Sequence, residues 1–322
     1  MRGWSAAGGP PVLGVVAALL AAPSVVPAAA AQGAGADGPV VLQTGGSVRQ
    51  TGLNGAGAAL VGDAGTVFSN PAGLATIRHV ALEAGYFTAP FDAYQSTAAL
   101  GWRLGQFTFG LGAKYFSFGT EPEIVPDPAT GGLGGMPTGA SVSAGEFLGV
   151  GSAIYRFGVL AIGGSAKFIR QRIADIEVSA VSGDIGLAIA VFDIAALGFA
   201  VQNVGGNWKD GSPLTVPRLS RVGFTMNYVD PQGAFRLLST LEGQWQAGRS
   251  ARVVFGLEGG LVIGGVGLLG RSALGSRPAG SDRSGITYGL TVEIARLSID
   301  YAFEPREQLG DASQRIGARV ML

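Results

Sequence analysis

The sequence predicts an all-β protein: a transmembrane antiparallel β-barrel of about 14 strands with a small N-terminal hatch, or plug, that contains short helices. Three observations lead to this class. From Val80 onward, apolar residues alternate with small or polar ones, the period of a β-strand. The chain is strongly apolar, yet no stretch beyond its N-terminal segment approaches 18 uninterrupted apolar residues. A Gly- and Ala-rich stretch with almost no charge, residues 53–77, precedes the alternating region.

The N-terminal 31 residues are expected to be a cleaved signal peptide. Arg2 supplies a positive charge, residues 12–22 form an apolar core, and the alanines at 29–31 form a cleavage site before Gln32. A membrane-spanning helix is the alternative, but it needs about 20 apolar residues, and two prolines interrupt this run. The expected domains are a signal peptide (1–31), an N-terminal segment with the hatch (32–79) and the barrel (80–322).

The amino-acid composition limits the possible protein classes but does not choose between a soluble β protein and a membrane barrel. Mean hydropathy is +0.36 and only 14% of residues are charged, against about 25% in typical proteins. Such a chain has either a large soluble β core or apolar side chains that face lipid, and β-structure spans a bilayer only as a closed barrel. The absence of Cys excludes disulfides. With 22 basic and 22 acidic residues, no nucleic-acid partner is expected.

The hatch is expected to contain a short helix that starts at Asn70. Asn is a preferred helix N-cap, and Pro71 suits the first helical turn. Leu74 and Ile77 then lie three residues apart on one face. A compact helical plug ahead of a β-domain is expected to sit inside a barrel. The candidate gating residues are Asp63, Phe68, Asn70, Pro71, Ala72, Gly73, Leu74 and Ile77.

The same stretch resembles the N-terminal hatch of FadL-like outer-membrane barrels, most closely those of the PorV/PorQ group. The resembling residues are Arg49, Gly52, Leu53, Gly55, Ala56, Asp63, Phe68, Asn70, Pro71, Ala72, Gly73 and Leu74. Residues 197–205, 214–223 and 300–317 are similar to later segments of that group, so the likeness runs from about residue 49 to the end. It implies fourteen strands and the outer membrane of a Gram-negative-type cell.

One departure concerns the C-terminus. Many outer-membrane barrels end in an aromatic residue that the barrel assembly machinery recognises, whereas this chain ends in Val320, Met321 and Leu322. The barrel assembly machinery remains an expected partner, together with outer-membrane lipid.

Alternation places the expected strands. They cover 80–88, 94–103, 106–118, 146–157, 159–171, 180–192, 196–204, 219–229, 234–246, 251–262, 265–274, 284–294, 295–303 and 314–322. Fourteen is even, as in single-chain bacterial barrels; the resemblance implies the same number, so the two are not independent. A Lys or Arg facing mid-bilayer lipid costs about 2–4 kcal/mol, so charges are expected in the lumen or near the rims. Aromatic girdles are expected at Tyr86, Trp102, Phe118, Tyr228, Trp245 and Tyr301.

Connections between strands divide into short turns and three long segments. Turns are expected at 156–158, 230–233, 247–249 and 264–265. The longer connections are 119–143, 205–217 and 272–283. They follow the third, seventh and eleventh strands, so they share one end of the barrel. Because long loops lie outside in outer-membrane barrels, all three are expected to be extracellular.

No constellation of catalytic or metal-binding residues is found, so no enzyme activity, cofactor or metal is expected. His79 is the single histidine, which argues against zinc sites and Ser/His catalysis. The Gly-rich run 265–270 begins a strand rather than a helix, so it does not predict a dinucleotide site. Asp127 lies in a loop whose spacing matches no calcium loop.

Asp63 is the charged residue of the hatch that invites a functional interpretation. It is either a helix cap or an ion-pair partner of a lumenal Arg or Lys, or it is a latch whose release opens a passage. The ion-pair or cap interpretation is favoured, because buried charges are usually paired.

Three functions remain open. The first is passive transport of hydrophobic small molecules past the hatch. The second, which the PorV/PorQ resemblance implies, is a component of type IX secretion that receives secreted cargo proteins from the translocon. The third is a structural barrel without transport.

Overall fold

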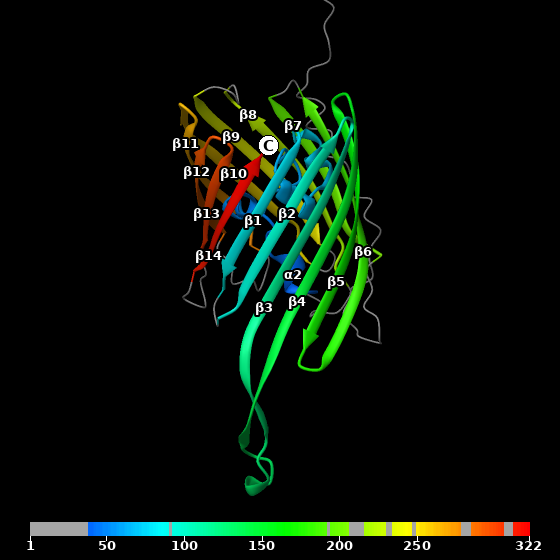
Figure 1. The fold of residues 1–322 in the computed structure, drawn as a ribbon, viewed down its shortest axis with the longest axis vertical. Coiled ribbons are helices and arrows are strands. Elements are labelled where there is room, and N and C mark those ends of the chain that lie inside the picture. The colour runs from blue at the N-terminus through cyan, green and yellow to red at the C-terminus, as the bar shows by residue number, and fades with distance from the viewer. Residues whose placement is uncertain are drawn as a thin grey trace, which may run out of the picture.

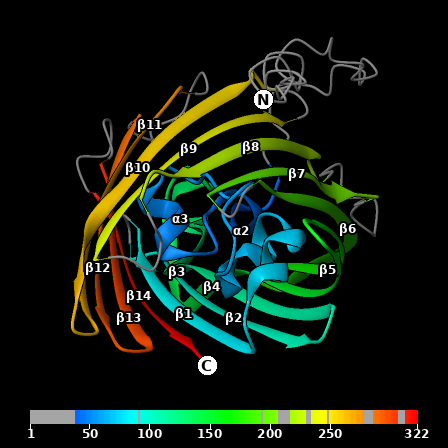
Figure 2. The same ribbon diagram turned by 90° about the horizontal axis from the view of Figure 1, so that it is seen from above.

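Fourteen strands form one closed antiparallel barrel, in which β1 pairs with both β2 and β14. The computed structural model describes residues 38–89, 92–191, 194–205, 216–229, 234–246, 249–277, 285–305 and 312–322. The expected signal peptide lies outside these residues. The strands are β1 Val80–Thr88, β2 Tyr94–Leu104, β3 Phe107–Pro126, β4 Gly135–Phe157, β5 Leu160–Ile173, β6 Ile176–Val191, β7 Ala195–Val204, β8 Leu219–Asn227, β9 Phe235–Gln246, β10 Arg252–Ile263, β11 Val266–Gly275, β12 Ile286–Ile294, β13 Leu297–Glu304 and β14 Ser313–Met321. Figures 1 and 2 show the barrel from the side and from above.

The predicted fold class and the count of fourteen strands are confirmed. Every strand pairs with its neighbour in sequence, so the barrel is a simple up-and-down meander. In the described residues, no helix has both the length and the apolar character needed to cross a bilayer.

The prediction that residues 119–143 form a loop is wrong, because most of them belong to β-strands. Strands β3 and β4 continue as a ribbon that pairs from Thr120↔Ser143 to Pro126↔Gly135. A short 3₁₀ helix, η3 (Pro128–Thr130), and Gly131 with positive φ form its tip. The ribbon projects far beyond the barrel rim (Figure 1). The segment 119–143 contains four prolines, and proline is tolerated where a strand edge has no further partner.

Alternation produces two faces, as expected. Along β11 and β12 every second residue is exposed, and these exposed residues include Leu268, Leu274, Tyr288 and Leu290. The intervening positions are buried or half-buried. In the described strands, the buried charged side chains are Glu83, Lys114, Glu146, Lys167, Asp184, Glu242, Glu258, Arg271, Asp300, Glu304, Arg315 and Arg319. The expectation that charges on the strands face the lumen is confirmed for these residues.

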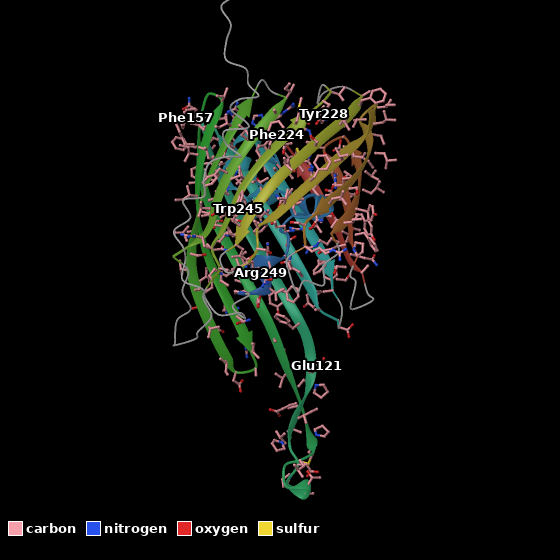
Figure 3. The ribbon with its side chains drawn as sticks, turned by 180° about the vertical axis from the view of Figure 1, so that it is seen from behind. Glu121, Phe157, Phe224, Tyr228, Trp245 and Arg249 are labelled. Atoms are coloured by element: carbon pink, nitrogen blue, oxygen red, sulfur yellow. The ribbon has the colours of Figure 1, made fainter. Side chains whose placement is uncertain are left out.

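Large apolar and aromatic side chains cover the outer face (Figure 3). Tyr86, Trp102, Tyr228, Trp245 and Tyr301 are exposed, as outward-facing girdle residues must be. Phe118 does not share this face, and its assignment to a girdle is wrong. It is half-buried and makes an edge contact with Phe116, with ring centroids 4.8 Å apart. The reason is periodicity: residue 118 has the same parity as the buried Lys114 and Phe116.

The two ends of the barrel carry different connections. At one end, two-residue hairpins join strands at 105–106, 158–159, 264–265 and 295–296. Gly105, Gly158, Gly264 and Ala295 begin these hairpins with positive φ, the geometry that tight hairpins require. The turn expected at 264–265 is thus confirmed, and the one expected at 156–158 lies at 158–159. Of the other two expected turns, 230–233 lies outside the described residues, as do residues 247 and 248 of the turn at 247–249. The β3–β4 ribbon and the connections after β7 and β11 lie at the other end, which we call the mouth; residues 206–215 and 278–284 are not among those described.

Candidate functional site

The hatch, residues 40–77, lies inside the barrel (Figure 2). It consists of α2 (Val40–Gln43), α3 (Val48–Gly52), η1 (Ala64–Phe68) and η2 (Pro71–Thr76). All of the predicted gating residues Asp63, Phe68, Asn70, Pro71, Ala72, Gly73, Leu74 and Ile77 are buried in it. The structure therefore brings these residues together within the lumen, and whether they gate it stays a prediction.

Asn70 organises the hatch locally, as its capping role predicted. It precedes η2, and its side-chain oxygen accepts a hydrogen bond from the backbone N–H of Ala72 at 3.0 Å. Its amide nitrogen donates to the carbonyls of Ala58 at 2.6 Å and of Leu187, on strand β6, at 3.1 Å. One fully buried side chain thus starts the helix, closes the preceding loop and ties the hatch to the wall.

Six buried or nearly buried charges form a closed ring of alternating sign, which we call the charge ring. Arg49 and Asp63 belong to the hatch, whereas Glu258 (β10), Arg271 (β11), Asp300 (β13) and Arg319 (β14) belong to the wall. In order around the ring, the nitrogen–oxygen distances are Arg49–Asp63 2.7 Å, Asp63–Arg319 2.6 Å, Arg319–Asp300 2.6 Å, Asp300–Arg271 3.1 Å, Arg271–Glu258 2.8 Å and Glu258–Arg49 2.7 Å. Three arginines balance three carboxylates.

The charge ring joins the hatch firmly to one side of the barrel. Burial by itself would raise the pKa of Asp63, but the guanidinium groups of Arg319 and Arg49 outweigh it and hold that pKa below its ordinary value. The carboxyl is therefore ionised at neutral pH. Breaking a buried ion pair by removing one partner costs about 3–5 kcal/mol, because the other charge stays buried without compensation. The ion pair expected for Asp63 is present; its use as a latch remains a hypothesis.

Wall side chains also bind the backbone of the hatch, a set of contacts that the sequence analysis missed. The carboxylate of Glu242 accepts hydrogen bonds from the N–H groups of Gly57 and Ala58 at 2.6 and 2.7 Å. Glu83 accepts from Gly65 at 2.8 Å. Further backbone contacts are made by Lys114, Glu146, Gln202, Arg221, Thr287 and Arg315. The signal that could have found them is a charged or amide side chain at an inward position of an otherwise small-residue strand.

A β-bulge in the wall lies beside one of these contacts. Between β6 and β7 the register shifts at Asp184, opposite Gln202 and Asn203. Asp184 pairs with Lys167 at 2.8 Å, and Asn203 adopts a positive φ of 62°. Alternation along β7 places Gln202 inward, where it donates to the carbonyl of Phe68 at 2.8 Å, and at the bulge the next residue, Asn203, is buried as well.

At the mouth, half-buried apolar side chains of the hatch and of the wall pack against one apolar core. Val40, Leu42, Ala89, Ala93, Phe118 and Val178 are half-buried and pack against the apolar core that includes Val41 and Phe116. We call these six residues the mouth cluster. They come from the hatch, the β1–β2 connection, β3 and β6, and they give the mouth an apolar surface that is accessible in part. In the described residues, no group of acidic, His or Cys side chains suited to a metal ion is found.

Solved structures with the same fold include two toluene transporters and a FadL homologue. The toluene transporter TbuX of Ralstonia pickettii aligns with a TM-score of 0.57 at 14% identity, over 86% of this chain and 98% of that chain. The fold is that of FadL-like outer-membrane barrels. The toluene transporter TodX of Pseudomonas putida gives a TM-score of 0.58 at 10% identity, over 85% and 96% of the two chains. A FadL homologue of Pseudomonas aeruginosa gives 0.53 at 12% identity, over 85% and 98%.

These likenesses concern the fold. No protein-family model matches the chain, and no curated protein matches it in sequence. The site itself must therefore support any statement about function.

Proposed function

We propose that the protein is an outer-membrane channel for the passive transport of hydrophobic small molecules. A molecule enters at the mouth, contacts the mouth cluster and passes the hatch toward the end of the barrel with short turns. In this proposal residues 1–31 are a cleaved signal peptide, outer-membrane lipid surrounds the barrel, and the mouth faces the outside of the cell.

The mouth cluster is the observation that carries the proposal. Apolar side chains such as Leu42, Phe118 and Val178 remain partly accessible at the open end of a polar lumen. Sites for small hydrophobic ligands are concave and mostly apolar, so this surface favours an apolar ligand over a sugar or an ion. Two structures with the same fold are named toluene transporters, which agrees with that preference.

Uptake tests the proposal directly. A Gram-negative host with an intact outer membrane would express the protein, and accumulation of radiolabelled toluene and of oleate would be measured. Val178→Asp places a charge on the mouth cluster and is expected to lower uptake, whereas Val178→Leu, the matched apolar control, is expected to preserve it. Uptake equal to that of cells without the protein would overturn the proposal.

A second candidate function is a PorV-like role in type IX secretion, in which the barrel receives cargo proteins from the translocon. The β3–β4 ribbon favours it. From residue 120 to residue 143 the two ribbon strands pair with each other, and one further backbone hydrogen bond, 3.1 Å long, runs from Ala174 to Ser143 at the base of the ribbon. The ribbon exposes Ile124, Leu133 and Met136 at its far end. Exposed apolar residues on a projecting element suit contact with another protein.

This second function has its own test. The genome that encodes the chain must also encode a type IX translocon and cargo proteins with the matching C-terminal signal. Where these exist, replacing residues 120–143 by a short turn is expected to stop cargo release and to leave toluene uptake unchanged. If neither transport nor secretion depends on the protein, a structural barrel without transport is the remaining interpretation.

A further inference from the structure

The hatch is attached to the wall in two different ways. From Val41 to Asn70, hydrogen bonds and ion pairs to wall side chains recur along the chain, among them those of Glu146, Glu242 and Glu83 and those of the charge ring. Asn70 ends this series with its bond to Leu187. From Pro71 to Thr76, the described residues include no hydrogen bond or ion pair to the wall. The carbonyl of Ile77, just after η2, accepts one long hydrogen bond, 3.4 Å, from the guanidinium of Arg103 on β2, which also donates to Gly105 at 2.9 Å. The helix η2 is therefore held in place without polar contacts of its own to the barrel.

Instead, η2 packs against the wall through apolar contacts where the wall has glycine. A side-chain carbon added at Gly110 (β3) would lie 2.4 Å from Leu74 Cδ1, and one added at Gly101 (β2) would lie 2.3 Å from Ile77 Cδ1. One added at Gly163 (β5) would lie 3.1 Å from the backbone nitrogen of Ala72. These six residues form what we call the η2 seam. A backbone hydrogen bond from Gly62 to Gly73, 3.0 Å long, links η2 to the rest of the hatch.

An apolar solute can replace contacts of only one of these two kinds. Toluene or an acyl chain inserted along the η2 seam would exchange one set of apolar contacts for another. The same solute inserted beside the charge ring would separate buried charges from their partners. An apolar molecule has no charged or hydrogen-bonding group that could replace those partners. The contacts between hatch and wall therefore determine which segment of the hatch can move and which class of solute can displace it.

We propose that the hatch works in two parts: residues 40–70 stay fixed to the wall, and η2 with Ile77 moves away from β2, β3 and β5 to admit an uncharged, apolar solute. This movement breaks one hydrogen bond to the wall, the 3.4 Å bond from Arg103 to Ile77. The moving part is short and is held at both ends, by Asn70 and by the start of β1 at Val80. This inference rests on the proposed function, and it specifies which segment opens and which solute class opens it.

Disulfide locks test the inference in a chain that has no Cys of its own. The seam lock is Leu74→Cys with Gly110→Cys, in which the first substitution removes the atom that a side chain at residue 110 would strike. The control lock is Val48→Cys with Gly85→Cys, which joins α3 to β1; a carbon added at Gly85 would lie 3.2 Å from Val48 Cγ2. Both locks tie the same hatch to the same wall, one at β3 and the other at β1, on either side of β2.

Toluene uptake is measured with each lock oxidised and then reduced. The oxidised seam lock is expected to bring uptake to the level of cells without the protein, with recovery after reduction, whereas the control lock is expected to leave uptake unchanged in both states. Unchanged uptake with the seam locked, or loss of uptake with the control lock alone, would overturn the inference and leave the proposed function intact.

A second readout does not depend on transport. Single variants Leu74→Cys and Val48→Cys of the purified barrel are labelled with a water-soluble maleimide, with and without toluene. Toluene is expected to speed labelling at residue 74 several-fold and to leave residue 48 unchanged. Equal effects at both positions, or none, would contradict the inference. Should the reduced variants show no uptake at all, the proposed function fails, and this labelling experiment still decides which part of the hatch moves.

Discussion

Replacing Asp63 by Asn is the perturbation that most sharply tests the charge ring. Asp63 is 3% exposed and contacts Arg319 and Arg49 at 2.6 and 2.7 Å. The substitution keeps the shape of the side chain and leaves the ring with one excess positive charge. Loss of one partner from a buried pair costs about 3–5 kcal/mol. Because Arg49 keeps Glu258 and Arg319 keeps Asp300, we take the lower figure.

Local opening of the hatch is the quantity to measure. A cost of about 3 kcal/mol corresponds to roughly a hundredfold increase in the open population, at about 1.4 kcal/mol per factor of ten. Val48→Cys provides the reporter, because residue 48 is buried on α3 next to Arg49. The rate of maleimide labelling at this residue follows the open population when reclosing is fast. We expect Asp63→Asn to raise that rate about a hundredfold.

A charge-balanced double variant is the matched control. Arg49→Gln combined with Asp63→Asn removes one charge of each sign from the hatch and leaves two complete pairs in the wall. Its labelling rate is expected to fall well below that of Asp63→Asn alone. If the single variant labels at the original rate, or if the double variant labels faster than the single one, the hatch is not held by the charge ring and the reasoning is refuted.

Three further predictions follow from the same contacts. Asn70→Ala removes three hydrogen bonds of a fully buried side chain and is expected to destabilise the hatch by about 2–4 kcal/mol. The measurement is proteolysis within residues 53–77, which is expected to be faster than in the original protein; an equal rate in both proteins would contradict the role of Asn70. The lowered pKa of Asp63 means that its contribution is complete above the ordinary value of 3.8 and is lost as the pH falls through the lowered pKa of the folded protein. The labelling rate at Val48→Cys rises with the thiolate fraction in every variant, so the ratio of the rates with and without Asp63→Asn is expected to stay constant from pH 5 to 8; a ratio that shrinks toward pH 5 would contradict this sign. Replacing residues 120–143 by a short turn is expected to leave the heat-dependent gel mobility of the barrel unchanged, because the two ribbon strands pair with each other and only Ser143, at the base, accepts a backbone hydrogen bond from a neighbouring strand connection in the described residues; a barrel that fails to assemble would show that the ribbon stabilises it.

Local physics made much of the fold predictable. A period of two in side-chain character, as along β12, fixes both the strand and the face that each residue occupies. The Asn70–Pro71 pair specified a helix start through contacts within two residues, and the structure confirms it as a 3₁₀ helix. These features need no knowledge of the rest of the chain.

The features that the sequence did not reveal depend on distant residues or on missing neighbours. Arg319 lies 256 positions from Asp63, so no local pattern could name it as the partner. The β3–β4 ribbon, which contains four prolines, was taken for a loop, and proline is tolerated where strands have free edges. Phe118 was assigned to an outward-facing girdle because it lies near a strand end. Its position in β3 has the same parity as that of Lys114, so its side chain points into the barrel.

Accessibility along β12, in a bilayer, tests the central claim most directly: apolar side chains face lipid while the N-terminal hatch fills the barrel. Single Cys residues at positions 286 to 294 would carry spin labels, and relaxation by lipid-soluble oxygen would be compared with relaxation by a water-soluble nickel complex. The account predicts that labels at Tyr288, Leu290 and Val292 respond to oxygen alone, and that labels at Thr287 and Thr291, which are buried beneath the hatch, respond weakly to both. A strand on which all positions respond equally to the nickel complex would contradict it.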